Sequence, residues 1–296
     1  MPSHLSVLVL HHKTPQLLQQ CLKRLCDYSP EAHITVVDTG PAEAAESLVR
    51  RDFPGVRLLK AANYSMAHAV NCGLKTTRTP FVCHMNADVL IEADTLSALL
   101  DVVKEDGVGM AGPLCLTAEG VPQDQGLPYR RFYRRLAHTH APSLAVPWLS
   151  GCMQVVTRDV LLAVGGMDGS LRFYNEDTEW CWRLGRAGYA CHLAKTSVVH
   201  LGGRSTPDTP AFLIEGFRGG YRLSQRYKSP LYRSAHRWAV LAMAAWQQRA
   251  LRDPAKRQAY AEIAAMFRQR RFDVSPFGAS LAEHNPAFPG AIQPAR

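Results

Sequence analysis

The first 116 residues alternate short apolar runs with longer amphipathic segments. The apolar runs lie at 6–10, 33–38, 56–60, 81–85 and 108–116. Four segments between them have the 3.6-residue spacing of helices. They are 14–28, a segment that follows residue 38 and ends near residue 51, 65–77 and 94–104. Thr14 and Pro15 stand at the cap and first position of the first helix. Strands that alternate with helices predict an α/β fold with a mostly parallel sheet.

The pattern fades between residues 117 and 148 and returns afterwards. This stretch includes YRRFYRR at 129–135 and no clear apolar period, so we predict a long mobile loop or lid that orders when substrate binds. A strand and a short helix are expected over 151–166, and a helix over 177–186 with Gly188 as its C-terminal stop. Apolar runs at 189–194 and 197–200 complete a compact domain.

Beyond residue 210 the pattern predicts amphipathic helices as far as residue 272. Residues 211–296 contain 14 Lys and Arg and 5 Asp and Glu, which leaves 20 of each kind before them from totals of 34 and 25. The excess of +9 therefore lies wholly in this extension. A basic surface of this kind suits an anionic membrane, an acidic substrate or nucleic acid, and charge alone does not choose between them.

The cysteines and the N-terminus indicate the compartment. The eight cysteines form no CxxC pair and lie mostly in apolar segments, as expected of reduced thiols. The N-terminus has no basic region before its short apolar run, so it is more typical of a first strand than of a signal peptide. We expect a cytoplasmic protein that is also suited to the inner face of the membrane as a peripheral protein.

Polar residues stand where several apolar segments end: Asp38, Asn86 with Asp88, Glu176 with Asp177, and His200. The carboxyl ends of parallel strands share one edge of a sheet, where open α/β folds bind ligands. Asp38 and Asp88 should therefore meet in one crevice, which suits a nucleotide and a divalent ion. The competing interpretation is that these acids only cap turns and helices.

Six stretches in order resemble the inverting GT-A glycosyltransferases of family 2, and most closely their rhamnosyltransferase-like branch. They are SVLVLHHKTP, VVDTG, NYSMAHAVNCGL, HMNADV, the segment from SGCMQVV to WRLGRAG, and VVHLGGRST. The resemblance covers about residues 5–206. It implies a mixed, mostly parallel GT-A sheet over 1–210, with a nucleotide-binding half at 1–116 and an acceptor half at 117–210, followed by a basic helical extension at 211–296.

The resemblance also implies a substrate pair and a metal site. The donor would be a nucleotide sugar, with dTDP-L-rhamnose favoured, and the acceptor a glycan or glycolipid such as a lipopolysaccharide core. Asp88 and His200 would hold Mg²⁺ or Mn²⁺ against the donor diphosphate. Asn86 replaces the first acid of the family's DxD motif and would contact the ribose or a metal-bound water.

Further roles follow from matching motif positions. Those assigned to the nucleotide are His12 beside the base, Asp38 on the base N–H, Asn63 in the flanking loop and Arg204 at the diphosphate. The two adjacent acids at 176 and 177 would supply the general base of an inverting transfer, with Asp177 favoured and Glu176 as the alternative.

Three other classes stay open at this stage. They are a sugar nucleotidyltransferase, which should have a Gly-rich phosphate loop where this chain has HHKTPQLL, a basic nucleic-acid-binding protein, and an inactive binding module. The intact set of Asp88, Asp177 and His200 favours an enzyme, so no nucleic-acid partner is expected.

Overall fold

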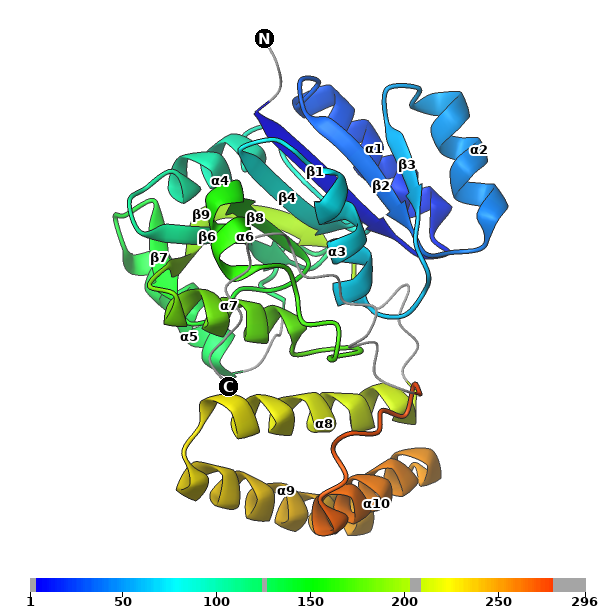
Figure 1. Cartoon of the computed structure of the whole chain (residues 1–296), viewed down its shortest axis with the longest axis vertical. Helices are drawn as coiled ribbons and strands as arrows, with labels where there is room; N and C mark the ends of the chain where they lie inside the picture. The colour runs from blue at the N-terminus through cyan, green and yellow to red at the C-terminus, as the bar shows by residue number, and fades with distance from the viewer. Residues whose placement is uncertain (1–3, 124–126, 203–208, 279–296) are drawn as a thin grey trace.

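The computed structural model describes residues 4–123, 127–202 and 209–278, and these form one sheet with helices on both faces and a helical C-terminal layer (Figure 1). The strands are β1 (Leu5–His11), β2 (His33–Asp38), β3 (Arg57–Lys60), β4 (Phe81–Asn86), β5 (Val89–Leu90), β6 (Val108–Leu116), β7 (Ser143–Val146), β8 (Met153–Thr157) and β9 (Ala190–His200). The helices are α1 (Pro15–Tyr28), α2 (Ala42–Asp52), α3 (Met66–Thr76), α4 (Thr95–Val103), α5 (Leu127–His138), α6 (Arg158–Val164), α7 (Glu176–Arg186), α8 (Pro210–Tyr227), α9 (Pro230–Ala250) and α10 (Pro254–Gln269).

The sheet is mixed. Its order is β3-β2-β1-β4-β8-β6-β9-β5, with β7 paired to β9. Strands β1 to β4 pair in parallel, as the alternating pattern predicts, and β6 is parallel to β9. Strands β8, β5 and β7 pair antiparallel with their neighbours. The predicted α/β fold, with a mixed sheet that is parallel in its first half, is therefore confirmed.

Alternating side chains of the strands supply two separate cores. In β1, Leu5, Val7 and Val9 face the core covered by α1, α2 and α4, whereas Leu8 faces the core covered by α3, α5, α6 and α7. Helix α3 lies very close to the sheet, because a Cβ atom on Gly73 would approach Leu8 Cδ1 to 2.8 Å. These two layers hold the strand ends rigidly.

The prediction of a long loop over 117–148 is wrong for much of that stretch, which contains α5 and β7. Tyr129, Tyr133 and Leu136 lie on one side of α5 and are buried in the second core, while the arginines around them point to solvent. The arginine and aromatic run thus forms a packed helix with its arginines at the surface, and not a long loop. The apolar spacing was obscured because tyrosines, not aliphatic residues, face the core.

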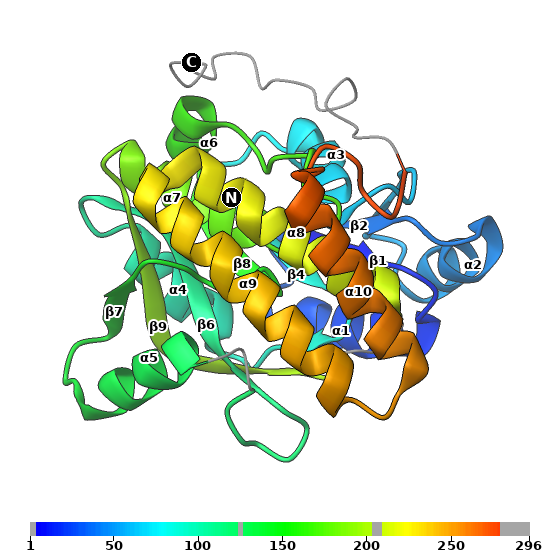
Figure 2. The same ribbon diagram turned by 90° about the horizontal axis from the view of Figure 1, so that it is seen from below.

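The predicted C-terminal helices are present. Each begins with a proline, at Pro210, Pro230 and Pro254, a residue that suits the first position of a helix. They share a small core around Phe267 and lie together at one end of the molecule (Figure 2). Among the described residues no helix is long and apolar enough to cross a membrane. The eight cysteines all lie in the described part of the chain, none of them forms a disulfide, and six are buried.

A buried ion pair on α8 joins this helix to the segment before α7. Glu215 and Arg218 are 0% and 1% exposed, and Arg218 Nη2 donates to Glu215 Oε1 at 2.6 Å. Arg218 also donates to the carbonyls of Ser170 and Phe272, and Glu215 accepts from the Arg172 N–H at 3.1 Å. Burying these charges requires all their partners, so α8 is fixed against the segment that leads into α7.

Candidate functional site

The carboxyl ends of the parallel strands place the first group of predicted residues at one edge. In the register of the sheet, His11 lies opposite Asp38, Asp38 opposite Lys60, and Leu10 opposite Asn86. Asp38 and Asn86 therefore lie on either side of β1, about 10 Å apart at the usual strand spacing. The ends of β2 and β4 thus share one edge of the sheet, and a single crevice for Asp38 and Asp88 stays a prediction.

The Asp38 carboxylate is fully buried and already has several donors. Its Oδ1 accepts from His11 Nδ1 at 2.9 Å and from the Gly40 N–H at 2.9 Å, and Lys60 donates to Oδ2. Burial opposes ionisation, but these donors outweigh it and lower the pKa of Asp38 to about 2. A contact with a nucleotide base stays a prediction, and the base would share these oxygens with the protein.

His11 also replaces the predicted cap of α1. Thr14 makes no side-chain capping bond, and its N–H instead donates to His11 Nε2 at 3.0 Å. With Nδ1 donating to Asp38, the imidazole is held at both nitrogens. It thus connects the start of α1 to the end of β2.

His12 and Asn63 flank the same edge. His12 Nδ1 lies 3.1 Å from Thr39 Oγ1, and burial lowers the pKa of this imidazole, so it is neutral at pH 7. Asn63 is exposed in the loop before α3. Both are placed where a ligand at the strand ends would meet them, although their roles stay predictions. Arg204 lies outside the described residues.

Asp88 and His200 come together as predicted. Strand β5 pairs with the end of β9, and His200 Nε2 lies 3.4 Å from Asp88 Oδ1. The separation is near the roughly 3 Å expected between adjacent ligands about 2.1 Å from one cation. Gln123 Oε1 lies 2.8 Å from His200 Nδ1, so a proton on Nδ1 leaves the Nε2 lone pair directed at the Asp88 side.

The donor set at this position fits a divalent ion. No cluster of three or more His, Cys, Asp or Glu side chains occurs in the part of the chain that the structure describes. Two protein ligands leave most positions of a Mg²⁺ or Mn²⁺ ion for water and phosphate oxygens, as is usual where the ion binds with a nucleotide.

Asp177 reaches the same region through the residues that precede β8. Its Oδ2 accepts from the Gly151 N–H at 3.0 Å, and the carbonyl of Cys152 accepts from the Asn86 N–H at 2.9 Å. Gly151 has no room for a side chain, because a Cβ atom there would lie 3.1 Å from Asp177 Cβ. Asp177, the second residue of α7, and Asn86, at the end of β4, therefore bind two adjacent residues of one backbone segment.

Glu176 and Asp177 differ in their surroundings. Glu176 is buried, and its Oε2 has no hydrogen-bond donor among the described residues. Burial, followed by repulsion from Asp177, raises the pKa of Glu176 to about 8. Burial also raises the pKa of Asp177, but the N–H groups of Gly151 and Thr178 partly oppose this effect. Asp177 is thus the acid of the pair whose hydrogen bonds favour the charged form.

The backbone before α7 is strained. Tyr174 and Asn175 have φ values of 66° and 70°, a region that non-glycine residues seldom adopt. Asn175 is held there by a hydrogen bond from its Nδ2 to the carbonyl of Gly216 on α8, at 3.1 Å. Such strain is typical of segments whose position matters for function. It sets the direction in which the two acids leave the turn.

Arg172 links three parts of the site and was not predicted. It is only 7% exposed, and its Nε donates to the carbonyl of Tyr64, beside Asn63, at 2.9 Å. Its own N–H donates to Glu215 on α8. The loop before α3, the segment before α7 and α8 are thereby held together.

The sequence held a signal for some of the missed residues. His11 and Lys60 are, like Asp38, the last residues of parallel strands, so the rule that selected Asp38 also selects them. Gln123 and Arg172 lie in irregular segments and had no such signal.

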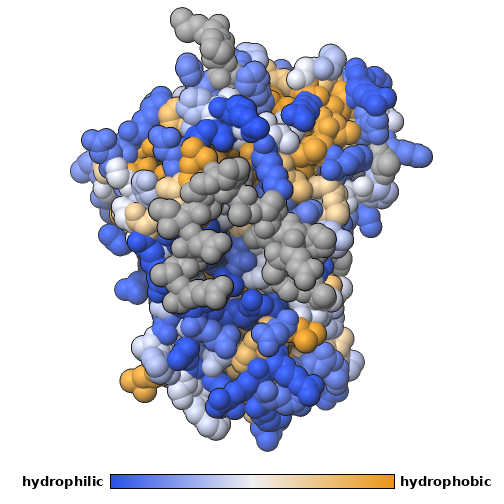
Figure 3. Space-filling view, in the orientation of Figure 1, coloured by the Kyte–Doolittle hydropathy of each residue, from blue (hydrophilic) through white to orange (hydrophobic). Residues whose placement is uncertain are grey.

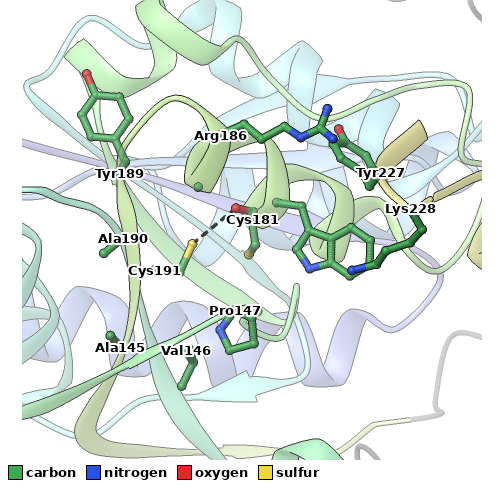
Figure 4. Close-up of a pocket in the computed structure, with 12 residues that line it drawn as sticks. Ala145, Val146, Pro147, Cys181, Arg186, Tyr189, Ala190, Cys191, Tyr227 and Lys228 are labelled. Atoms are coloured by element: carbon green, nitrogen blue, oxygen red, sulfur yellow. Dashed lines mark hydrogen bonds between the residues drawn. The ribbon is translucent and has the colours of Figure 1, made fainter. Parts of the chain in front are cut away.

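A separate cavity of about 480 Å³ lies at the other end of α7 (Figure 4). Its wall includes Trp182, Arg186, Tyr227 and Lys228, and the Lys228 amine lies 4.3 Å from the centre of the Trp182 ring. Arg186 follows Asp177 by nine residues, roughly 13 Å along a helix. None of the predicted site residues lines this cavity.

Known proteins resemble both the sequence and the fold. Residues 6–165 match the family model described as Glycosyl transferase family 2. An N-acetylglucosaminyl-diphospho-decaprenol L-rhamnosyltransferase of Mycobacterium tuberculosis, recorded for two strains, is 26% identical over 245 residues, which cover 70% of this chain and 79% of that protein.

Two solved structures share the fold. One is the mannosyltransferase PcManGT from Pyrobaculum calidifontis in complex with GDP-Man and Mn²⁺, with a TM-score of 0.58, 21% identity and coverage of 91% of this chain and 83% of that one. The other is GalNAc-T7 with UDP, GalNAc and Mn²⁺, with a TM-score of 0.64, 14% identity and coverage of 91% and 56%. The family model spans more than half of the chain, so this protein belongs to glycosyl transferase family 2 and is a glycosyltransferase of the GT-A fold.

Proposed function

We propose that this enzyme is a metal-dependent, inverting rhamnosyltransferase that moves L-rhamnose from dTDP-L-rhamnose to a hydroxyl of a bacterial glycan or glycolipid. The rhamnosyltransferase relative, whose name includes a lipid-linked N-acetylglucosaminyl diphosphate, supports both the sugar and the acceptor class. Both structural relatives are complexes with Mn²⁺ and a nucleotide or nucleotide sugar. A lipopolysaccharide core is one acceptor of this class.

One observation carries the proposal: the short backbone link between Asp177 and the end of β4. The Gly151 N–H binds Asp177, and the next residue, Cys152, binds Asn86 through its carbonyl. A carboxylate is thereby held beside the strand end that carries Asp88. An inverting transfer needs a base on one side of the sugar and a site for the leaving diphosphate on the other.

In the proposed reaction, Asp177 accepts the proton of the acceptor hydroxyl as its oxygen bonds to the anomeric carbon. The bond from that carbon to the donor phosphate breaks on the opposite face, so the configuration inverts and dTDP leaves. The N-terminus of α7 favours the ionised carboxylate before the acceptor arrives. Glu176 is protonated at neutral pH and acts as a buried neighbour, not as the base.

The remaining predicted residues hold the donor. Asp88 and His200 would bind the divalent ion, which neutralises negative charge on the departing diphosphate when bound. Asn86 would contact the ribose or a water on the ion. The nucleotide contacts are proposed for His12, Asp38, Asn63 and Arg204.

The test is donor binding measured by calorimetry with a panel of nucleotide sugars, each with MnCl₂, MgCl₂ or EDTA. We expect dTDP-L-rhamnose to bind more tightly than GDP-mannose or UDP-N-acetylglucosamine, and only with a divalent ion. Asp88→Ala should weaken metal-dependent binding by about tenfold or more, because the carboxylate ligand is lost.

A matched control is Asp94→Ala. Asp94 is exposed, lies six residues after Asp88 and makes no capping bond, so its removal should leave donor binding unchanged. Equal binding with EDTA and with MnCl₂ would contradict the metal role. Preference for another nucleotide sugar would replace the proposed donor.

A further inference from the structure

The outward face of α9 has an unusual composition. The exposed residues between 231 and 248 are Leu231, Tyr232, Ser234, Ala235, Trp238, Ala239, Ala242 and Trp246. Seven of these eight are apolar or aromatic. Leu231 is 81% exposed, and both tryptophans are 62% exposed. Orange patches also interrupt the hydrophilic surface of the helical end in the space-filling view (Figure 3).

These residues form one continuous stripe. Leu231, Ala235, Trp238, Ala242 and Trp246 repeat at intervals of three or four residues, so they share one side of the helix. The stripe is about 22 Å long at the rise of an α-helix. The opposite side packs against α8 and α10 through Val240 and Ala244. A helix on the surface of a soluble protein normally turns polar residues outward, so this face is suited to a partner.

Cations lie at both ends of the stripe. Lys228 precedes it, and Arg249 and Arg252 follow it, all with exposed side chains. Arg249 is 18 residues after Leu231, five full turns, and therefore lies on the same side. Helix α9 itself contains no Asp or Glu. The partner should accordingly be apolar in its interior and negatively charged at its surface.

We propose that the outward face of α9 binds an anionic phospholipid membrane and lies flat on it. Tryptophan, tyrosine and leucine side chains would enter the region between headgroups and acyl chains, and the flanking cations would pair with phosphates. In Figure 2 the three C-terminal helices lie across the end of the molecule, with α9 accessible there. The proposal extends the proposed function, because a lipid-linked acceptor resides in such a membrane.

A second copy of the chain fits this face less well. Two copies packed through α9 would place Lys228 of one beside Arg249 or Arg252 of the other in the antiparallel arrangement, and like beside like in the parallel one. Either arrangement brings cations together, and α9 has no acid to offset them. An anionic membrane removes this repulsion.

The test is cosedimentation of the full-length enzyme with vesicles of phosphatidylcholine, alone or mixed with phosphatidylglycerol. We expect binding to the mixed vesicles that weakens with added salt, and much less binding to phosphatidylcholine alone. The variant carrying Trp238→Ser and Trp246→Ser should bind the mixed vesicles about tenfold or more weakly. Arg249→Gln with Arg252→Gln should reduce the dependence on salt.

Controls separate membrane binding from misfolding and self-association. Tyr28→Ser removes an aromatic side chain that is 40% exposed on α1, so it should bind vesicles like the wild type. Leu231→Ser offers a single, milder change in the stripe. Equal vesicle binding by the wild type and the double tryptophan variant, with both folded, would overturn the proposal. So would a dimer in light scattering that the same substitutions dissociate.

The outcome is independent of the donor assignment. A variant that loses vesicle binding should keep metal-dependent binding of dTDP-L-rhamnose, since α9 contributes none of the predicted site residues. If no nucleotide sugar binds but the vesicle result holds, the proposed function is wrong and the membrane surface is not.

Discussion

Two regions of this glycosyltransferase bury carboxylates, and they shift the pKa values of these carboxylates in opposite directions. At the end of β2, Asp38 has donors on both oxygens, and its pKa falls to about 2. At the start of α7, Glu176 has an oxygen without a donor, and its pKa rises to about 8. The difference shows that the supply of donors, more than burial, decides whether a buried acid is charged.

Asp177 lies between these extremes, and that suits a base. It has donors from Gly151 and Thr178, which favour its charged form, while burial keeps its pKa above the ordinary value. A carboxylate as well satisfied as Asp38 would be a weak proton acceptor, whereas one like Glu176 would be protonated before the acceptor arrived.

The largest expected effect is the loss of transfer in Asp177→Asn. We expect kcat to fall by about 10²–10⁴-fold with donor affinity nearly unchanged, because the amide cannot accept the proton. Glu176→Gln is the matched control and should stay within about tenfold of the wild type, since Glu176 is already protonated at pH 7. Initial rates with an excess of donor measure both, and full activity in Asp177→Asn would remove its assignment as the base.

The next effect concerns Asp38, whose two carboxylate oxygens both accept hydrogen bonds. Asp38→Asn should lower the free energy of unfolding by about 2–4 kcal/mol, because Lys60 and His11 lose a charged partner in a buried position. Asp27→Asn, which breaks an exposed pair with Lys23, should cause no measurable change. Denaturant titration at pH 7 compares the two, and equal stability of both variants would mean that the Asp38 network adds little.

The third effect, the smallest over a single pH unit, is a change in the pH dependence of stability. The folded-state pKa of Glu176 is raised from 4.5 to about 8, so its contribution to stability is fully present below pH 4.5 and is lost as pH rises toward 8. The wild type should lose on the order of 1 kcal/mol per pH unit relative to Glu176→Gln within this window. The Asp38 contribution changes only below about pH 4 and does not interfere. Parallel curves for the two proteins would place the Glu176 pKa near its ordinary value.

The hydrophobic pattern predicted the helices and strands well wherever apolar side chains face the core and polar side chains face solvent. The strands of the first half end where their apolar runs end, and α7 stops at Arg186 before Gly188, which has φ of 90°. The pattern did not predict helix α5, because the residues that face the core include Tyr129 and Tyr133. The tyrosine side chain is partly polar, so its burial is not evident from the sequence.

Some residues of the candidate site could likewise be predicted from the sequence, and others could not. Asp38, Asn86, Asp88, Asp177 and His200 were chosen from the sequence because they stand where apolar segments end and because their motifs occur in the order expected of the resembled family. Gln123 beside His200, Arg172 beside Tyr64, and Gly151 beside Asp177 could not be chosen in this way. Each acts through a partner between 26 and 108 residues away.

The sequence alone thus determined the α/β class, the edge of the sheet where its parallel strands end, and which acids are proposed to react. Only the tertiary structure decided which of the two adjacent acids has hydrogen-bond donors, which nitrogen of His200 faces Asp88, and that the outward side of α9 is apolar. The physical reason is that protonation and exposure depend on the donors and the packing around a group, and those come from parts of the chain that only folding brings together.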